Sequence, residues 1–297
     1  MYRAYFALPE FLSKKGLPTN AIYGTFSMLH TMISDFEAEY VVFCMDTPKP
    51  TFRKQLYKEY QAQRPDTPDN FVQQIPVIKQ MLDKGGIARA ELPGYEADDV
   101  IGTLASRYKN DYRVLILSSD KDILQLVDTN VLVVSPKVGI SSVMLYQAAD
   151  VVEKMGVRPD QIPDLKGLMG DPSDNYYGAK GIGPKTANKL LTEYNTIENL
   201  FLNIAKIHNE KLRNVLIASK ENVFLSKKLA TIQTTAPVVF DIHQAYFNGY
   251  QPELKRLLQE YNMSTLLERL YDVPKIKSKL KSAKEAEAKD VTQIDLF

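Results

Sequence analysis

The first half of the chain alternates short apolar runs with helical patterns, and this alternation is the strongest constraint on the fold. Runs rich in β-branched residues occupy 40–45, 87–92, 113–119 and 131–135, and amphipathic segments of helix length separate most of them. Strands that alternate with helices form a mainly parallel sheet flanked by helices on both faces. After about residue 150 the strand-like runs stop, and helix-length segments punctuated by proline and glycine follow. We therefore predict an α/β domain over 1–155 and a helical region over 156–273.

Size and composition fit an ordinary soluble protein. The 297 residues are 44% hydrophobic and 25% charged, which suffices for one large domain or two smaller ones. The sequence shows no apolar run of roughly eighteen residues and no signal-peptide pattern, so we expect a cytoplasmic location. The single cysteine, Cys44, lies in an apolar run and is expected to be a buried, inert thiol. The net charge of +1 leaves a nucleic-acid partner open, because opposed patches can cancel.

Carboxylates follow three of the predicted strands at the point where each strand ends. The stretch "GYEADDV" alone crowds three acids into four positions. The carboxyl ends of parallel strands meet at one edge of a sheet, where ligands bind. The turn "GDPSDN", which opens the helical region, can fold back over that edge with two more. The eight acids are Asp46, Glu96, Asp98, Asp99, Asp120, Asp122, Asp171 and Asp174.

These acids can be read as helix caps or as a metal site. Aspartate is favoured at helix N-termini, and for any one of these acids capping is the simpler explanation. Capping does not require acid pairs such as "DKD" and "DPSD" after successive strands. Carboxylates that converge without histidine or cysteine suit hard cations, so we predict Mg²⁺ or Mn²⁺ and not zinc. Two ions about 4 Å apart would clamp the attacking and leaving oxygens of a phosphodiester, which indicates a phosphate substrate.

Two further segments have features of nucleic-acid binding. In "NYYGAKGIGPKTANKLL", Gly181 and Gly183 precede a predicted helix whose N-terminus can receive a phosphate. Residues 47–70 interleave basic and aromatic side chains, as channels for single-stranded nucleic acid do, and are long for a connection. The simpler alternatives are a tight turn for the first and an amphipathic surface helix for the second. A general phosphatase would need neither segment.

Five motifs in unbroken order carry a family resemblance. The stretches "VVFCMDTPKPTFR", "GYEADDVIGTLA", "SSDKDILQLV", "LMGDPSDNYYGAKGIGPKTA" and "LATIQTT" together resemble the 5′-3′ exonuclease domain of bacterial DNA polymerase I and its stand-alone relatives, the flap endonuclease family. The resemblance implies a PIN-like nuclease core and a helix-hairpin-type element for duplex DNA in the helical region. It also implies removal of 5′ flaps and RNA primers in lagging-strand synthesis and DNA repair.

The resemblance assigns roles to individual residues. The eight acids match the family's metal ligands, and 47–70 matches the helical arch through which the 5′ strand passes. The residues implied to act in catalysis are Asp46, Glu96, Asp98, Asp120, Arg64 and Lys58. The resemblance implies phosphate contacts for Arg3 and Arg64. Together with the residue patterns described above, it predicts DNA contacts at Arg3, Arg53, Lys54, Tyr60, Gln61, Arg64, Lys180, Gly181, Gly183, Lys185 and Thr186.

The sequence departs from the family at two points. Family members begin with an apolar strand ending in "DG" before a "YRA" segment, whereas this sequence starts at Met1. We expect a longer natural protein to supply that strand and its metal-binding aspartate. A catalytically weakened DNA-binding or scaffold relative is the alternative. The second departure is Gln61, where the arch usually carries a lysine thought to help activate the scissile phosphate. Lys58, one helical turn earlier, is a candidate substitute.

The C-terminal segment 274–297 is lysine-rich and poor in apolar residues until its end, which indicates a flexible arm. Its last five residues, "QIDLF", resemble the pentapeptide by which bacterial proteins bind the replication sliding clamp. The anchors of that peptide would be Gln293, Leu296 and Phe297. A clamp would raise the local concentration of the nuclease at primer junctions. An apolar chain end that packs on its own domain is the alternative.

Overall fold

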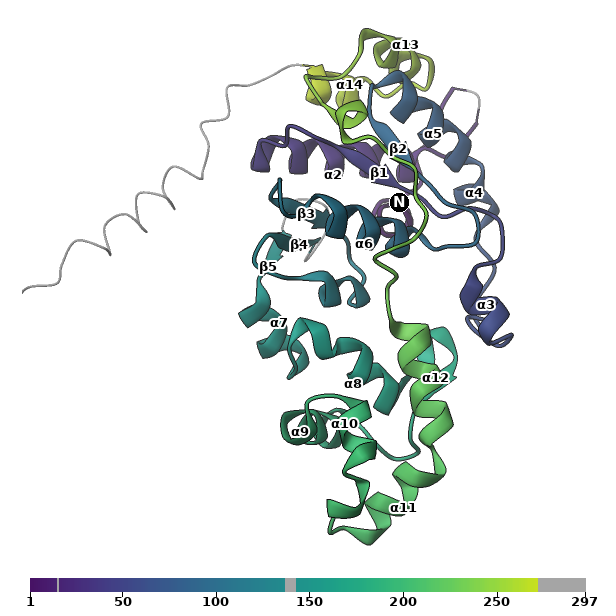
Figure 1. Ribbon diagram of the computed structural model, residues 1–297. Helices are drawn as coiled ribbons and strands as arrows, with labels where there is room; N and C mark the ends of the chain where they lie inside the picture. Colours follow the sequence, from purple (N-terminus) through teal and green to yellow (C-terminus); the bar gives the residue numbers. More distant parts are fainter. Residues whose placement is uncertain (15, 137–142, 272–297) are drawn as a thin grey trace, which may run out of the picture.

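Figure 1 shows the computed structural model, which describes residues 1–14, 16–136 and 143–271. The first half contains α1 (Tyr2–Ala7), α2 (Asn20–Phe36), β1 (Val42–Cys44), α3 (Phe52–Leu56), α4 (Asp69–Val72), α5 (Gln74–Lys84), β2 (Ala88–Ala90), α6 (Ala97–Tyr108), β3 (Val114–Leu117), the 3-10 helix η1 (Asp122–Leu126), β4 (Val131–Pro136), β5 (Val143–Tyr146) and α7 (Ala148–Met155). The second half contains η2 (Pro159–Gln161), α8 (Ile162–Met169), β6 (Gly170–Asp171), η3 (Pro172–Asp174), β7 (Tyr176–Tyr177), α9 (Pro184–Tyr194), α10 (Ile197–Leu202), η4 (Ile204–Lys206), α11 (Glu210–Ala218), α12 (Lys220–Ala230), η5 (Ile242–Ala245), α13 (Pro252–Glu260) and α14 (Ser264–Tyr271).

The strands of the α/β half form two separate small sheets, called here the first and second parts of the sheet. β1 pairs in parallel with β2, and β3 pairs in parallel with β4. β5 extends the second part in the antiparallel direction, which gives the order β3-β4-β5. The predicted α/β class with mainly parallel pairing is confirmed. β5 was not predicted, because a run of four residues gives too short a pattern to separate strand from loop. Among the described residues no strand bridges β1 and β3.

Helix α6 places part of the acidic stretch at the carboxyl end of β2. It begins after Glu96 because Glu96 and Asp99 form a capping box, in which the Asp99 carboxylate accepts the Glu96 backbone N–H at 3.0 Å. The apolar face of the helix buries Val100 and Leu104 against the rest of the domain. The capping box and this packing therefore fix the position of the acids in the first turn of α6.

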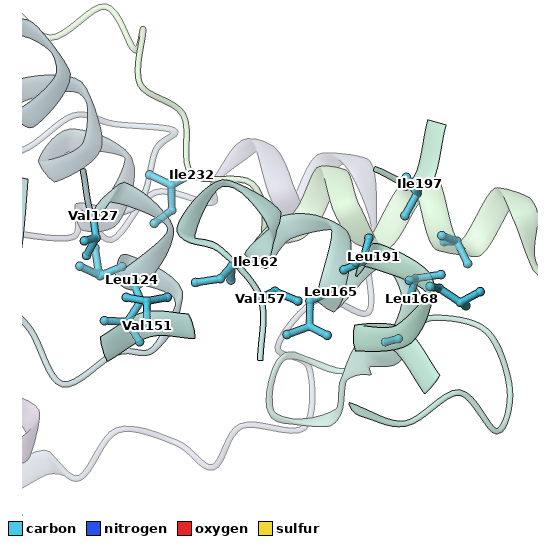
Figure 2. Packing of buried hydrophobic residues seen from close by; sticks show 14 of the residues in the cluster. Leu124, Val127, Val151, Val157, Ile162, Leu165, Leu168, Leu191, Ile197 and Ile232 are labelled. Carbon is cyan, nitrogen blue, oxygen red and sulfur yellow. The ribbon is translucent and has the colours of Figure 1, made fainter. Parts of the chain in front are cut away.

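The largest apolar cluster joins the second part of the sheet to the helical region. Figure 2 shows Leu124 of η1 near Ile162 of α8, and further along the cluster Leu165 and Leu191. All four side chains are almost fully buried. This packing holds the C-terminal end of α8, and the turn that follows it, in a fixed relation to η1.

The helices of the predicted region 156–273 lie at two places in the structure. α8 to α12 form the lower part of the molecule in Figure 1, and the chain then runs back to the α/β half. There α13 and α14 pack on α2 and α5 through Leu254, Leu258, Leu266 and Leu270, each at most 4% exposed. The apolar faces of these two helices explain why they close the core of the first half.

Candidate active site

Four carboxylates, the proximal acids Asp46, Glu96, Asp98 and Asp120, lie together beyond the ends of β1, β2 and β3. Asp46 Oδ1 accepts the backbone N–H of Ala97 at 2.7 Å, so Asp46 lies against the first turn of α6. Burial raises the pKa of Asp98 well above its ordinary value, and the charges of Asp120, Asp46 and Glu96 raise it further. Parallel pairing of β1 and β2 places Asp46 and Glu96 beyond the same end of the first part, and Asp120 follows β3 of the second part.

Three more carboxylates, the distal acids Asp122, Asp171 and Asp174, form a second group. One oxygen of each lies within 4.8 Å of the others. Asp171 is held in its turn by Ser173, whose backbone N–H and hydroxyl donate to it at 2.8 and 2.6 Å. Burial raises the pKa of Asp122 to about 6, with Lys166 lowering it and Asp120 raising it. Since Asp120 acts on both Asp98 and Asp122, the two groups form one acidic site.

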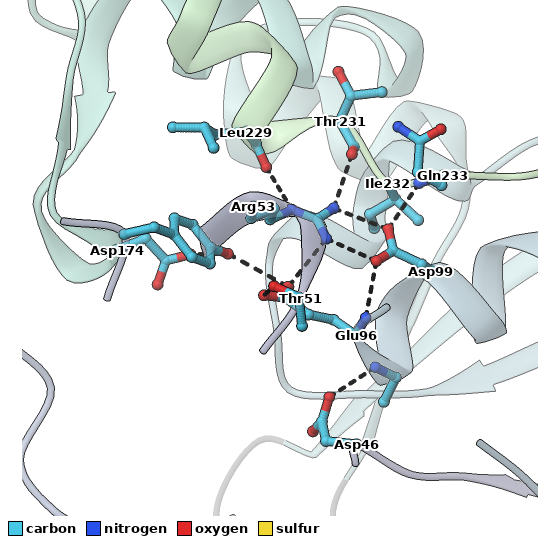
Figure 3. A network of polar contacts seen from close by, with 12 residues as sticks. Asp46, Thr51, Arg53, Glu96, Asp99, Asp174, Leu229, Thr231, Ile232 and Gln233 are labelled. Atoms are coloured by element: carbon cyan, nitrogen blue, oxygen red, sulfur yellow. Dashed lines mark hydrogen bonds and ion pairs between the residues drawn. The ribbon is translucent and has the colours of Figure 1, made fainter. Parts of the chain in front are cut away.

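Asp99, predicted as the eighth metal ligand, has a different partner. It is 0% exposed, and its two oxygens accept the guanidinium of Arg53 at 2.7 and 2.9 Å (Figure 3). The same oxygens accept the backbone N–H groups of Glu96 at 3.0 Å and Gln233 at 2.9 Å. Adjacent side chains on a helix point about 100° apart, which turns Asp99 inward and Asp98 toward the other acids. In this structure Asp99 therefore pairs with Arg53, and its role as a metal ligand stays a prediction.

Arg53, predicted to contact DNA, is the buried partner in this pair. It is 2% exposed, and beyond Asp99 it donates to the carbonyls of Leu229 at 2.8 Å and Thr231 at 2.9 Å. Burial alone would lower the pKa of Arg53, but the hydrogen bond to Asp99 and the charges of Glu96 and Asp99 raise it above its ordinary value, so the guanidinium stays charged. Arg53 joins α3 to the C-terminal end of α12 and to Thr231 beyond it. Its side chain has almost no accessible surface in this structure, and its contact with DNA stays a prediction.

Glu96 lies between the buried pair and the proximal acids. Arg53 Nη1 is 3.3 Å from Glu96 Oε2, and the Glu96 side chain is 20% exposed. Burial raises the pKa of Glu96 to about 7, opposed by Arg53 and reinforced by Asp99, Asp46 and Asp174. One nearby arginine therefore does not offset the burial and the negative charge, and the site favours an additional cation.

The arch segment docks on the turn that carries the distal acids. Between α3 and α4, residues 57–68 form turns and irregular chain rather than a continuous helix. The Gln61 backbone N–H donates to the carbonyl of Asp174 at 2.9 Å, and Asn175 Nδ2 donates to the carbonyl of Glu59 at 2.8 Å. Arg64, 53% exposed, forms an ion pair with Asp174. Arg64 thus lies at the acidic site, as the family resemblance implied.

Tyr60, predicted to contact DNA, is also buried. It is 3% exposed, and its hydroxyl donates to Asp174 Oδ2 at 3.0 Å, with Glu96 Oε2 at 3.4 Å. Its ring stacks on Tyr176, with centroids 6.3 Å apart and planes 17° apart. A base cannot stack on a ring that is already covered on this side and buried on the other. In this structure Tyr60 links the proximal and distal acids, and its direct contact with DNA stays a prediction.

The remaining predicted DNA-binding residues lie at three places. Arg3 is half-buried in α1, Lys54 is half-buried in α3, and Lys58 is exposed on the arch. Near α9, a Cβ added at Gly181 or Gly183 would meet no atom within 4 Å, so the backbone before the helix is open to approach. Gly181 has φ of +80°, which favours glycine. Around it, Lys180 and Lys185 are exposed and Thr186 is half-buried.

Sequence reasoning missed two residues of the acidic site, Lys166 and Tyr176. The Lys166 ammonium pairs with Asp171 at 2.5 Å and also with Asp122. Tyr176 is 2% exposed, and burial raises the pKa of its hydroxyl, with Asp122, Asp171 and Asp174 raising it further. The available signal was weak: Lys166 precedes Asp171 by five positions on a predicted helix, and Tyr176 follows Asp174 by two.

Comparisons with known proteins define the class. Residues 1–156 match the family described as 5′-3′ exonuclease, N-terminal resolvase-like domain, and residues 157–253 match the 5′-3′ exonuclease, C-terminal SAM fold. The chain is 42% identical to a 5′-3′ exonuclease of Aquifex aeolicus over 271 residues, which is 90% of each chain. It is 39% identical to DNA polymerase I of Bacillus subtilis over 99% of its own length but spans only 34% of that relative.

Solved structures support the same fold. A structure described as divalent metal ions (zinc) bound to T5 5′-exonuclease has a TM-score of 0.62 at 20% identity and covers 84% of this chain and 89% of that one. The catalytic core of Rad2 in complex with DNA substrate has a TM-score of 0.56 at 18% identity, over 85% and 86%. This chain belongs to the 5′-3′ exonuclease family, whose members are metal-dependent nucleases that hydrolyse DNA. The comparisons give no support to the alternative of a weakened, non-catalytic relative.

The residues of the acidic site fit divalent cations. The seven carboxylates offer only oxygen donors, the ligands that Mg²⁺ and Mn²⁺ prefer. The raised pKa values of Glu96, Asp98 and Asp122 show that their charges are not fully offset by protein groups. A cation at either group of acids would relieve this excess.

Proposed function

We propose that the chain is a 5′-3′ exonuclease and 5′ flap endonuclease whose acidic site cuts phosphodiester bonds with the help of two divalent cations. The observation that carries the proposal is the convergence of seven carboxylates from four separate stretches of chain at one sheet edge, next to an arch that carries Arg64. Two neighbouring groups of carboxylates, the proximal acids and the distal acids, suit two ions better than one.

The residues divide between two ion sites. The proximal acids would hold one ion and the distal acids the other, with Mg²⁺ or Mn²⁺ as the ion. When bound, such ions supply Lewis-acid chemistry that activates water and stabilises the leaving oxygen. Asp46 and Asp171 are already oriented for this role. The backbone N–H of Ala97 donates to one oxygen of Asp46, and that of Ser173 donates to one oxygen of Asp171. No histidine is needed as a general base in this arrangement.

The chain's own cations would hold the DNA. Arg64 is half-exposed at the rim of the acidic site, and Lys58 is exposed on the same arch, so both can receive a phosphate. The α9 N-terminus offers unpaired backbone N–H groups with Lys180 and Lys185 beside it, which suits the backbone of duplex DNA without reading its sequence. Glutamine at position 61 leaves the phosphate-activating role of the family's lysine to Lys58.

The proposed substrates are DNA with a 5′ flap or a nick and RNA primers, in lagging-strand maturation and repair. Structures of relatives support a DNA substrate, since one is described as a T5 flap endonuclease complex with DNA and metal ions. A cytoplasmic location fits this role. In the described part of the chain no helix is both long and apolar enough to span a membrane. Clamp binding through Gln293, Leu296 and Phe297 stays a proposal, because these residues lie outside the described ones.

The test is release of a labelled 5′ flap by the full chain in Mg²⁺. Asp120→Ala should reduce the rate at least about a hundredfold, since loss of outer partners of metal sites alone costs 10- to 100-fold. Asp160→Asn, a change to an exposed acid paired with Arg158 away from the acidic site, is the matched control and should cut at the wild-type rate. Tight flap binding without Mg²⁺-dependent cleavage would instead support a scaffold protein.

A further inference from the structure

Lys166 occupies an unusual position for a lysine, inside the distal acids. It lies in the last turn of α8, and its ammonium contacts Asp122 from η1 and Asp171 from the following turn. The side chains of Lys166, Asp122 and Asp171 are only 15%, 16% and 14% exposed. The burial of η1 against α8 fixes both partners, so this contact is built into the fold.

Two aromatic side chains lie beside the distal acids. Tyr60 and Tyr176 stack beside them, and the Tyr176 hydroxyl has no hydrogen-bond partner among the residues that the structure describes. Charges that are largely buried interact more strongly than charges in water. Three carboxylates in this setting need counter-charge, and two protein cations, Lys166 and Arg64, supply most of it.

We propose that Lys166 is an exchangeable counter-cation of the distal acids, which leaves Asp122 and Asp171 when a divalent cation binds there. A lysine ammonium and a divalent ion on the same oxygens repel each other strongly at contact distance. The lysine has a flexible four-carbon stem, so its ammonium can move while α8 stays in place. This inference rests on the proposed function only in taking the distal acids as a cation site.

The exchange has a consequence for the order of binding. Because a divalent ion must displace Lys166, the free protein binds the distal ion weakly. DNA brings negative phosphate charge, which attracts both the ion and the released ammonium. Loading of the distal ion is thereby linked to the presence of DNA, and the free nuclease stays incompletely loaded.

The first experiment measures Mn²⁺ binding to the full chain without DNA by isothermal titration calorimetry and by paramagnetic resonance of free Mn²⁺. Lys166→Met keeps the length of the side chain and removes its charge, and it should tighten the weaker Mn²⁺ site about tenfold or more. Lys166→Arg keeps the charge and should bind Mn²⁺ like the wild type. Asp174→Asn identifies the weaker site, because it removes a distal ligand.

The matched control is Lys109→Met. Lys109 also forms an ion pair, with Asp128 at 2.6 Å, but it follows the far end of α6, roughly 16 Å of helix from Asp98. Its loss should leave both Mn²⁺ affinities unchanged. Unchanged or weaker Mn²⁺ binding in Lys166→Met would overturn the proposal, and so would an equal gain in Lys109→Met, which would reflect net charge alone.

A second measurement uses the unmodified protein and does not depend on the folding of a variant. Lysine acetylation by a small reagent is followed by mass spectrometry with and without Mg²⁺. The ion-paired Lys166 should react slowly in chelator and several-fold faster in Mg²⁺, while Lys109 reacts equally in both. A Lys166 reactivity that stays the same or falls on adding Mg²⁺ contradicts the exchange.

The outcomes separate this inference from the proposed function. A protein that shows the Mn²⁺ and acetylation results but releases no labelled flap would refute the nuclease activity and leave the exchange in place. A protein that cuts flaps in Mg²⁺ but shows no effect of Lys166→Met would refute the exchange alone.

Discussion

Asp98 and Asp99 are adjacent in the sequence and serve two regions that differ in charge balance. Asp98 faces the proximal acids, where burial and neighbouring carboxylates raise its pKa. Asp99 faces inward, and each of its oxygens accepts two hydrogen bonds, including two from Arg53. The first region has more negative than positive charge, because Arg53 beside Glu96 offsets it only in part, whereas the hydrogen bonding of Asp99 is complete. The comparison teaches that a site for added cations is recognised by what its acids lack, and not by the number of acids.

The largest expected effect comes from removing Arg53, the charged partner of Asp99. Arg53→Met leaves Asp99 buried without its charged partner and removes the two contacts to carbonyls at the C-terminal end of α12, those of Leu229 and Thr231. Breaking a buried ion pair costs about 3–5 kcal/mol, so the free energy of unfolding should fall by about that amount. Urea denaturation followed by circular dichroism measures it. A loss below about 1 kcal/mol would show that the pair is not fully formed.

The next largest effect comes from removing a carboxylate of the proximal acids, which should leave the fold intact. Asp98→Asn removes one proximal carboxylate and some of the mutual repulsion, so flap cleavage should fall at least about a hundredfold while the thermal midpoint in chelator stays the same or rises. The flap assay measures the cleavage rate, and a thermal melt measures the midpoint. The comparison fails if Asp98→Asn unfolds the protein as Arg53→Met does.

The third effect is a pH dependence of stability that arises from the acidic site. In the unfolded chain Glu96 ionises near 4.5, and in the folded protein burial raises its pKa to about 7. Between these values the folded protein binds more protons, so the free energy of unfolding without metal should fall as pH rises from about 4.5 to about 7. Asp122, raised from 3.8 to about 6, adds to the same trend at slightly lower pH.

Urea denaturation in chelator at several pH values tests this trend. Glu96→Gln should flatten the profile near neutral pH, because the amide does not titrate. Adding Mg²⁺ should reverse the slope, since ion binding requires ionised carboxylates and strengthens as they lose their protons. Stability without metal that rises through this pH range would contradict the view that the acidic site lacks positive charge.

Much of the fold and part of the site could be predicted from the sequence. The gathering of Asp46, Glu96 and Asp120 follows from parallel strands whose ends share one edge. The partner of Asp99 could not be predicted, because Arg53 lies 46 positions away and its other contacts lie 176 and 178 positions from it. Local patterns contain no information about such distant contacts.

The same limit applies to Tyr60, to Lys166 and to the last two helices. Tyr60 has the composition of a stacking residue, but its partners, Asp174 and Tyr176, come from a turn more than a hundred positions away. Lys166 carries the wrong charge for a metal ligand and therefore gave no metal signal. The return of α13 and α14 to the first half depends on which apolar faces meet, which helical periodicity does not specify.

A crystal structure of the full chain soaked in Mn²⁺, with the ions located by anomalous scattering, tests the central claim most directly. We predict ions at the proximal acids and at the distal acids, with Arg53 still paired to Asp99. Ions bound at Asp99, or anomalous signal only away from the seven carboxylates, would contradict the assignment of this edge of the sheet as the catalytic centre.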